Sequence, residues 1–220
     1  LLFKIFENQQ ITISEKLKQH FFSYLNIACV PAYALSVLWS THDLLFNAVG
    51  FVASVLQLIS LLFLLKIIQH VFLQISWNFI SKLLLKFALI SYSLKIISQI
   101  FSAFPYIVEK SLVLKPFFII GYLHLFTLGF LSVLLFLILD QMKKLNLRKP
   151  TSKVGIILFL SGVFITELLL FLQGFLFLFQ FNAIKNYSVI LLIFSFLMVI
   201  GLLAVYVNQF HKERIIKKTL

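Results

Sequence analysis

Residues 154–180 read VGIILFLSGVFITELLLFLQGFLFLFQ, and Glu167 is the one charged residue among them. The apolar residues follow one another without the alternation of a barrel strand, so the stretch is typical of a helix in lipid. A helix crosses a bilayer with about 20 predominantly apolar residues. This stretch therefore predicts a transmembrane helix with a carboxyl group near its middle.

Comparable apolar stretches occur along the whole chain. The 220 residues are 61% hydrophobic and have a mean hydropathy of +1.05, which is beyond the composition of a soluble domain. We expect an all-α fold, a polytopic transmembrane helical bundle in a single integral membrane domain over residues 1–220. Pro31 lacks a backbone donor and predicts a kink in the first span. The predicted spans, about six, lie near 20–40, 44–71, 83–104, 116–140, 154–180 and 187–209.

Lysine and arginine predict the orientation of these spans, because cytoplasmic connections carry an excess of both. Cations gather before the first span, around the second and fourth connections and in the tail, whereas the opposite side has Lys110, Lys115 and Lys185. Both termini should be cytoplasmic, with residues 1–19 as a lead-in and 210–220 as a basic tail. The cations of the predicted cytoplasmic side are Lys4, Lys16, Lys18, Lys66, Lys82, Lys86, Lys143, Lys144, Arg148, Lys149, Lys153, Lys212, Arg214, Lys217 and Lys218.

The net charge of +12 does not predict nucleic-acid binding, because the cations border the spans and form no separate basic domain. The sequence has no P-loop, dinucleotide fingerprint, His-Glu-x-x-His or Gly-x-Ser-x-Gly motif, so it predicts no enzyme class. Cys29 is the single cysteine, which excludes a cysteine-based metal cluster within the chain. The lipid bilayer is the predicted partner, and a ligand site would lie between helices or at their mouths.

The start of the chain predicts a fragment of a longer protein. Leu1 is not a start methionine, and residues 1–18 have no signal-peptide pattern. We expect Leu1–Phe6 to end an earlier span, and upstream helices or other membrane subunits to be partners of this domain.

The third predicted span carries a polar face. Ser91, Lys95, Ser98, Gln99 and Ser102 recur at helical spacing, which places them on one side of a helix. That side should point into the bundle. A lone ammonium at mid-span costs about 2.5–3.5 kcal/mol on insertion scales, so Lys95 needs a partner, water or a snorkelling path to the surface.

Glu167 should lie at a depth similar to that of Lys95, and the two are candidate ion-pair partners. Hydrocarbon favours the neutral carboxyl group, which can instead hydrogen-bond another helix. Where water reaches such a group, it can carry a proton. Structural pairing and proton transfer are therefore both open for Glu167 and Lys95.

His124 is the candidate cofactor-binding and metal-ligating residue, with haem or copper as the possible cofactor. It lies in the stretch GYLHLFTLG, residues 121–129, and an imidazole nitrogen can bind iron or copper. Gly121 or Gly129 would let a porphyrin or a neighbouring helix approach closely. No second histidine follows at helical spacing, so a packing histidine is the alternative. The remaining histidines fall near predicted span ends and predict interfacial roles: His20, His42, His70 and His211.

Two segments carry a family resemblance, ACVPAYALSVLW at 28–39 and IGYLHLFTLGF at 120–130. Together they resemble a family of bacterial polytopic membrane proteins that is longer at its N-terminus, which implies a bacterial inner-membrane protein without its first helices. The second segment is also distantly similar to histidine-bearing helices of haem–copper oxidase catalytic subunits and nitric-oxide-response membrane proteins. The resemblance implies a ligand role for His124 alone among the residues of this segment. The paired histidines of the binuclear centre are absent, so the resemblance does not imply oxidase turnover.

Three functions follow as hypotheses. The first is a haem- or metal-associated redox, sensing or assembly component that acts through His124. The second is a proton-coupled transporter in which Glu167 and Lys95 change protonation or partners. The third is a noncatalytic structural membrane subunit whose polar residues fix helix contacts.

Overall fold

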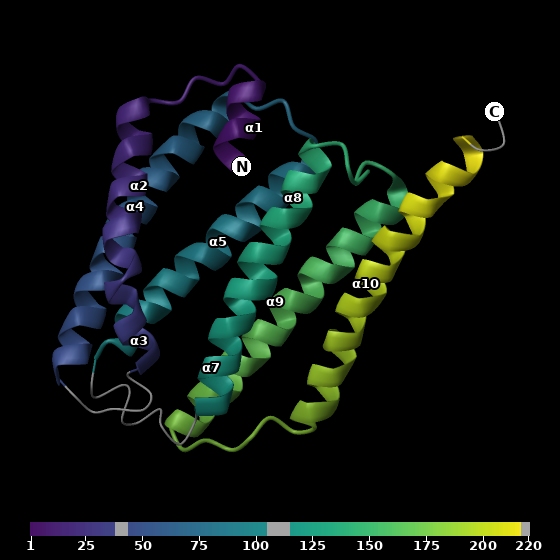
Figure 1. Cartoon of the computed structure of the whole chain (residues 1–220). Coiled ribbons are helices and arrows are strands. Elements are labelled where there is room, and N and C mark those ends of the chain that lie inside the picture. Colours follow the sequence, from purple (N-terminus) through teal and green to yellow (C-terminus); the bar gives the residue numbers. More distant parts are fainter. Residues whose placement is uncertain (38–43, 105–114, 217–220) are drawn as a thin grey trace. The chain divides into compact units, whose positions relative to one another are not determined.

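The computed structural model describes residues 1–37, 44–104 and 115–216, with side chains described to residue 209 except at 115 and 116. All regular structure in these ranges is helical, so the all-α prediction is confirmed (Figure 1). The helices are α1 Leu2–Asn8, α2 Glu15–Cys29, η1 Pro31–Tyr33, α3 Ala34–Val37, α4 Leu44–Gln74, α5 Phe79–Ser102, α7 Lys115–His124, η3 Leu125–Ser132, α8 Val133–Gln141, α9 Pro150–Leu178 and α10 Tyr187–Ile216.

Five helical segments within the described ranges are long and apolar enough to cross a membrane. Their length and composition make the chain a polytopic integral membrane protein. Three consecutive helices, α7, η3 and α8, form one of these segments without a break. The five segments are Leu44–Gln74, Phe79–Ser102, Phe117–Gln141, Pro150–Leu178 and Tyr187–Gln209.

Within the described residues, the stretch predicted as the first span is divided at Pro31. Helix α2 ends at Cys29, the 3₁₀ turn η1 starts at Pro31, and α3 follows directly. Proline cannot donate a backbone hydrogen bond to the preceding turn, which agrees with the predicted kink. Residues 38–40 of that predicted span lie outside the described residues, as do Lys110, His42, Lys217 and Lys218.

The chain divides into two compact units, residues 1–76 with 92–115, and residues 77–91 with 116–220. In the first unit α2 packs along α4. The Ser60 hydroxyl donates a hydrogen bond of 3.0 Å to the Phe21 carbonyl, and the ring of Phe63 stacks on those of His20 and Tyr24. These contacts join the two helices through both a polar bond and aromatic surface.

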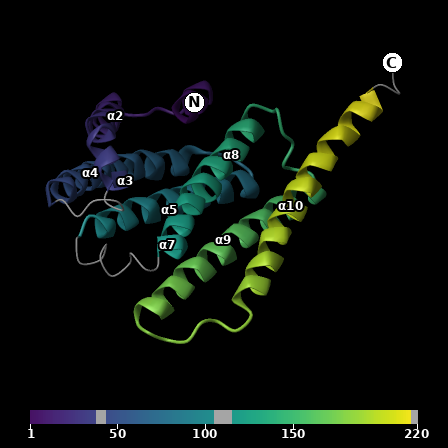
Figure 2. The same cartoon turned by 60° about the horizontal axis from the view of Figure 1, so that its bottom comes forward.

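In the second unit, α9 and α10 form a closely packed hairpin, and the two helices lie side by side in both ribbon views (Figures 1 and 2). Gly155 and Gly201 face each other across the two helices: a Cβ built on Gly201 would lie 2.5 Å from the Gly155 carbonyl oxygen. At Gly162, an added Cβ would collide with Met198. Small residues thus let the two backbones approach, as in other membrane helix pairs.

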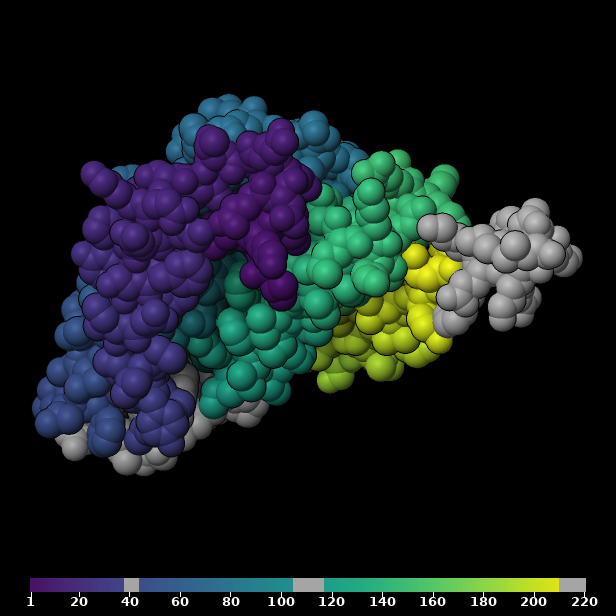
Figure 3. Space-filling view, turned by 45° about the horizontal axis from the view of Figure 1, so that its top comes forward, coloured from purple at the N-terminus to yellow at the C-terminus, as the bar shows by residue number. Residues whose placement is uncertain are grey.

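The other side of α10 presents large apolar side chains. Leu192, Phe196 and Leu203 are more than half exposed. Part of α10 is seen in yellow and yellow-green in Figure 3. Because these side chains recur at intervals of about one or two helical turns, they form a continuous stripe. Such a stripe suits contact with lipid acyl chains.

Candidate functional site

The candidate site lies in the second unit, where α7 passes into an unusual helical segment. His124 is the last residue of α7, and the next eight residues, Leu125–Ser132, form the π-helix η3. Two hydroxyl groups bond to the backbone here: Thr127 Oγ1 donates to the Leu123 carbonyl at 2.7 Å, and Ser132 Oγ donates to the Thr127 carbonyl at 2.9 Å. π-helical segments are rare and are frequently found at functional sites.

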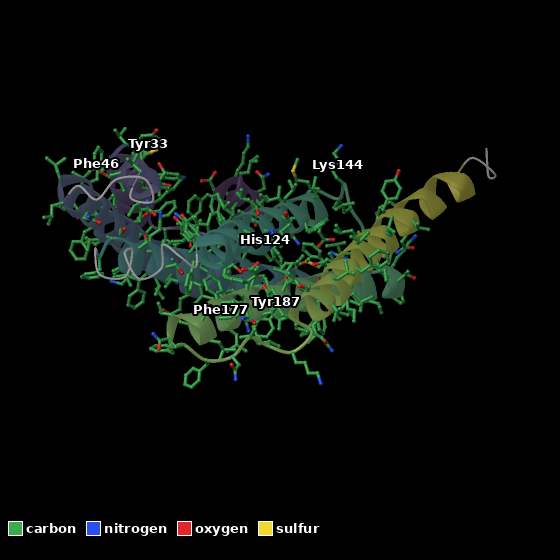
Figure 4. The ribbon with its side chains drawn as sticks, turned by 90° about the horizontal axis from the view of Figure 1, so that it is seen from below. Tyr33, Phe46, His124, Lys144, Phe177 and Tyr187 are labelled. Atoms are coloured by element: carbon green, nitrogen blue, oxygen red, sulfur yellow. The ribbon has the colours of Figure 1, made fainter. Side chains whose placement is uncertain are left out.

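His124 faces Glu167 of α9. Their closest polar atoms, His124 Nδ1 and Glu167 Oε1, are 3.6 Å apart. The carboxyl side chain is 9% exposed, whereas the imidazole side chain is 42% exposed, so the ring lies between a buried acid and the surface of the unit. Figure 4 labels His124 among the surrounding side chains. The structure therefore brings together two of the three predicted site residues.

The polar atoms of this pair have no hydrogen bonds within the described part of the chain. Both carboxyl oxygens of Glu167 and the Nδ1 of His124 are buried and unpaired. The separation is slightly longer than a hydrogen bond, which for a nitrogen and an oxygen spans about 2.7–3.2 Å. A small side-chain rotation would close it, and catalytic or proton-transferring pairs are often this long in unliganded structures.

Gly121 and Gly129 serve the packing of helices. A Cβ on Gly121 would lie 3.3 Å from the Phe171 ring of α9, and a Cβ on Gly129 would lie 2.7 Å from the Ser91 hydroxyl of α5. The space beside each glycine is thus filled by a neighbouring helix. Of the two uses that the sequence left open for these glycines, the structure shows the helix contact.

The donor set for a metal is small. In the described ranges no group of three or more His, Cys, Asp or Glu side chains could hold a metal ion. A single imidazole nevertheless suffices as one axial ligand of haem. Because Nδ1 of His124 points to Glu167, Nε2 is the nitrogen that such a ligand role would use, and the carboxyl group would orient the ring.

Lys95 belongs to the first unit and has a different partner. Its Nζ donates a hydrogen bond of 3.0 Å to Gln57 Oε1 on α4, and it lies 5.9 Å from the centre of the Tyr92 ring. The residues of the predicted polar face, Ser91, Lys95, Ser98, Gln99 and Ser102, are all buried or half-buried. The face thus points inward, as predicted.

The predicted contact between Lys95 and Glu167 would join residues of the two units and stays a prediction. Each of the two has a polar neighbour within its own unit, Gln57 for Lys95 and His124 for Glu167. Sequence reasoning did not single out Gln57 as the partner. Chain connectivity could have indicated this contact. Gln57 and Lys95 are equally far along the chain from residue 76, and a hairpin of α4 and α5 brings such residues together.

The other described histidines lie at exposed positions. His20 stacks on Phe63, with ring centroids 5.1 Å apart, and His70 is within 2.9 Å of Gln74 Nε2. Their interfacial role stays a prediction. The side chain of His211 is outside the described residues.

Comparison with known proteins identifies no relative: no family model, no curated protein and no solved structure matches the chain.

Proposed function

We propose that this chain is part of a proton-coupled membrane transport protein in which His124 and Glu167 carry the proton. The observation that supports it is the buried pair itself. Glu167 lies inside a membrane-spanning helix with both carboxyl oxygens unpaired, and His124 Nδ1 is 3.6 Å away. Ionisable residues inside the membrane are costly and commonly mark proton relays.

Proton transfer between the two groups needs no other reactant. The protonated carboxyl group of Glu167 gives its proton from Oε1 to Nδ1 of neutral His124, which leaves a carboxylate and an imidazolium. The imidazolium then gives its Nε2 proton to a water molecule, which this role requires beside the ring. A proton that arrives at Nε2 reverses both steps. His124 thus connects the buried carboxyl group with the surface.

Incomplete hydrogen bonding favours this role over a purely structural one. A polar pair that only fixes helix contacts is most stabilising when its hydrogen bonds are made, because an unmade buried bond costs about 1–3 kcal/mol. The described residues contain satisfied examples of that kind, such as Lys95 with Gln57 and Asn208 with Ser152. We assign a structural role to Lys95 in the first unit and proton carriage to His124 and Glu167 in the second unit.

Haem or metal binding through His124 is the second candidate, favoured by the exposed side of its ring and by the resemblance of residues 120–130 to histidine-bearing haem helices. Haem would supply one-electron chemistry. In this case His124 Nε2 would be the ligand atom, and the Glu167 carboxyl group would orient the ring by accepting a hydrogen bond from Nδ1–H. In either case, we propose that the protein lies in the bacterial inner membrane with both termini in the cytoplasm.

Proton flux in liposomes tests the first candidate. The full chain is reconstituted with a pH-sensitive dye inside the vesicles, and a pH gradient is imposed. We expect flux that is lost in Glu167→Gln and His124→Asn and retained in His70→Asn, which changes an exposed histidine in the same way. Flux that survives Glu167→Gln in folded protein contradicts the proposal.

Optical spectra distinguish haem or metal binding through His124 from proton carriage. Reduced-minus-oxidised difference spectra and the iron and copper content are measured on the same preparations. A ligand role of His124 predicts a haem or metal signal that His124→Asn removes and that Glu167→Gln weakens without abolishing. Proton carriage predicts flux loss in both variants whether or not a cofactor is bound.

A further inference from the structure

A cavity lies at the end of the second unit where α9 stops and α10 begins. Its volume is about 370 Å³, and aromatic rings from three helices line it: Phe117, Phe177 and Tyr187. Phe117 packs edge to face with Phe177 at 5.5 Å and with Tyr187 at 5.9 Å between ring centroids. Figure 4 shows Phe177 and Tyr187 next to each other. A cavity of this size and lining is in the range of small-molecule sites.

Gln173 lines this cavity and has an unpaired donor. The residue is 1% exposed, and its Oε1 accepts a hydrogen bond of 2.9 Å from the Ile184 backbone N–H. That bond fixes the orientation of the amide, because a backbone N–H cannot donate to an NH₂ group. Nε2 is buried and has no partner among the described residues. The two N–H bonds of this group therefore lack an acceptor among the described residues.

Tyr187 adds a second unused group. Its hydroxyl oxygen is buried and has no hydrogen-bond partner in the described part of the chain. A phenol hydroxyl donates strongly to a carboxylate oxygen. Two buried polar side chains that line one cavity and both lack partners are unusual in a folded protein, where most such groups are satisfied.

The first turn of α10 contributes to the same cavity. Tyr187 and Val189 donate their amides to the carbonyls of Ile184 and Asn186, at 3.2 and 3.0 Å. Ser188 between them makes no such bond within the described ranges and also lines the cavity. The amino end of a 30-residue helix carries partial positive charge and favours anions.

The cavity lining from Gln173 to Val189 lies in a stretch of sequence without acidic residues. No aspartate or glutamate occurs from residue 168 to residue 212, and Lys185 is adjacent in sequence to the lining residues Ile184 and Asn186. The lining of the cavity thus combines unpaired donor groups with apolar rings, and a lysine is adjacent to it in sequence. We propose that this cavity binds a small organic anion, a monocarboxylate with an aromatic body, whose carboxylate accepts from Gln173 Nε2 and the Tyr187 hydroxyl while its ring packs on Phe117 and Phe177.

This site is separate from the His124–Glu167 pair and does not depend on it. Gln173 is six residues beyond Glu167 on α9, which is about 9 Å along a helix axis. Loss of the proton-carrying carboxyl group should therefore leave ligand binding intact.

Binding of benzoate to the full chain in lipid nanodiscs tests the proposal, with benzyl alcohol as an uncharged ligand of similar shape. Saturation-transfer NMR and calorimetric titration measure the affinities. We expect benzoate to bind at least about tenfold more tightly than benzyl alcohol, because hydrogen bonds to a charged group are stronger than neutral ones. Equal affinity for both probes, or no benzoate binding, overturns the proposal and leaves a cavity filled by water or lipid.

Two variants locate the binding. Tyr187→Phe removes the hydroxyl and keeps the ring, and Gln173→Glu keeps an oxygen for the Ile184 N–H while it removes the NH₂ donors. We expect each to weaken benzoate binding about tenfold. Tyr206→Phe, the same change at the other end of α10, and Glu167→Gln should bind benzoate as the wild type does. Unchanged affinity in both Tyr187→Phe and Gln173→Glu, with thermal unfolding like that of the wild type, refutes the assignment.

Discussion

Substitution of Gly201 by alanine should separate the α9–α10 hairpin. A Cβ at this position would lie 2.5 Å from the Gly155 carbonyl oxygen and 2.7 Å from the Phe159 backbone nitrogen. Both atoms belong to the backbone of α9, so no flexible side chain can move aside. Overpacking of this kind costs about 1–3 kcal/mol, and alanine regains about 0.5–1 kcal/mol over glycine inside a helix. We therefore expect a net destabilisation of about 1–2 kcal/mol.

Gly121→Ala is the matched control for this prediction. Its added Cβ would meet the ring of Phe171 at 3.3 Å and the Leu170 Cβ at 3.6 Å. A ring at the end of a side chain can shift by a few tenths of an ångström, so the gain in helix propensity should offset the contact.

Unfolding by a denaturing detergent in mixed micelles, followed by circular dichroism, compares the two variants. The free energy of unfolding should fall for Gly201→Ala and stay near the wild-type value for Gly121→Ala. If Gly201→Ala is as stable as Gly121→Ala, the close approach of α9 and α10 is not the contact described here.

Two further predictions concern polar contacts outside the candidate site. Asp140→Ala should destabilise the second unit by about 1–3 kcal/mol, because Asp140 accepts hydrogen bonds from the Ser81 hydroxyl at 2.8 Å and from the Leu147 N–H at 3.2 Å. Detergent unfolding measures this loss of stability. Asp140→Asn keeps an acceptor, so we expect it to lose less stability than Asp140→Ala. The hydrogen bond and charge of Lys18, 2.7 Å away, hold the pKa of Glu7 below its usual value, and the Glu7 bond raises the pKa of Lys18. A lowered carboxyl pKa means that this contact supports α1 at neutral pH and is lost as the pH falls through the folded-state pKa of Glu7. Hydrogen exchange of α1, corrected for its intrinsic pH dependence, should therefore lose protection in acid for the wild type, whereas Glu7→Gln should already lack that protection at neutral pH. Equal protection in the two proteins at neutral pH would contradict this assignment.

The helical class was predictable because a lipid-spanning helix satisfies its own backbone. Long apolar stretches therefore predicted helices such as α4 and α9 without knowledge of their neighbours. The stretch around Pro31 was harder to predict. A 3₁₀ turn, η1, separates α2 from α3 there, whereas the loss of one backbone donor predicts a kink without predicting that the α-helix is interrupted.

Lys95 was predicted as a partner of Glu167 from depth alone, which stays a prediction, and depth does not distinguish between helices at the same level. Chain connectivity adds the missing information. His124 and Glu167 are equally distant along the chain from the centre of the connection at 142–149, and an antiparallel hairpin brings such residues together. The same geometry relates Gln57 and Lys95. The π-helix after His124 was not predictable from the apolar pattern, and the side-chain bonds of Thr127 and Ser132 accompany it.

The most direct test of the proposed proton exchange is infrared spectroscopy of the full chain in nanodiscs, recorded as the difference between two pH values. Glu167→Gln identifies the carboxyl band of Glu167 by its loss. The proton-carrying pair predicts that this band is present in the wild type, that it shifts in His124→Asn, and that imidazole bands change together with it. A spectrum in which Glu167→Gln removes no carboxyl band, or in which His124→Asn leaves that band unchanged, would contradict the account.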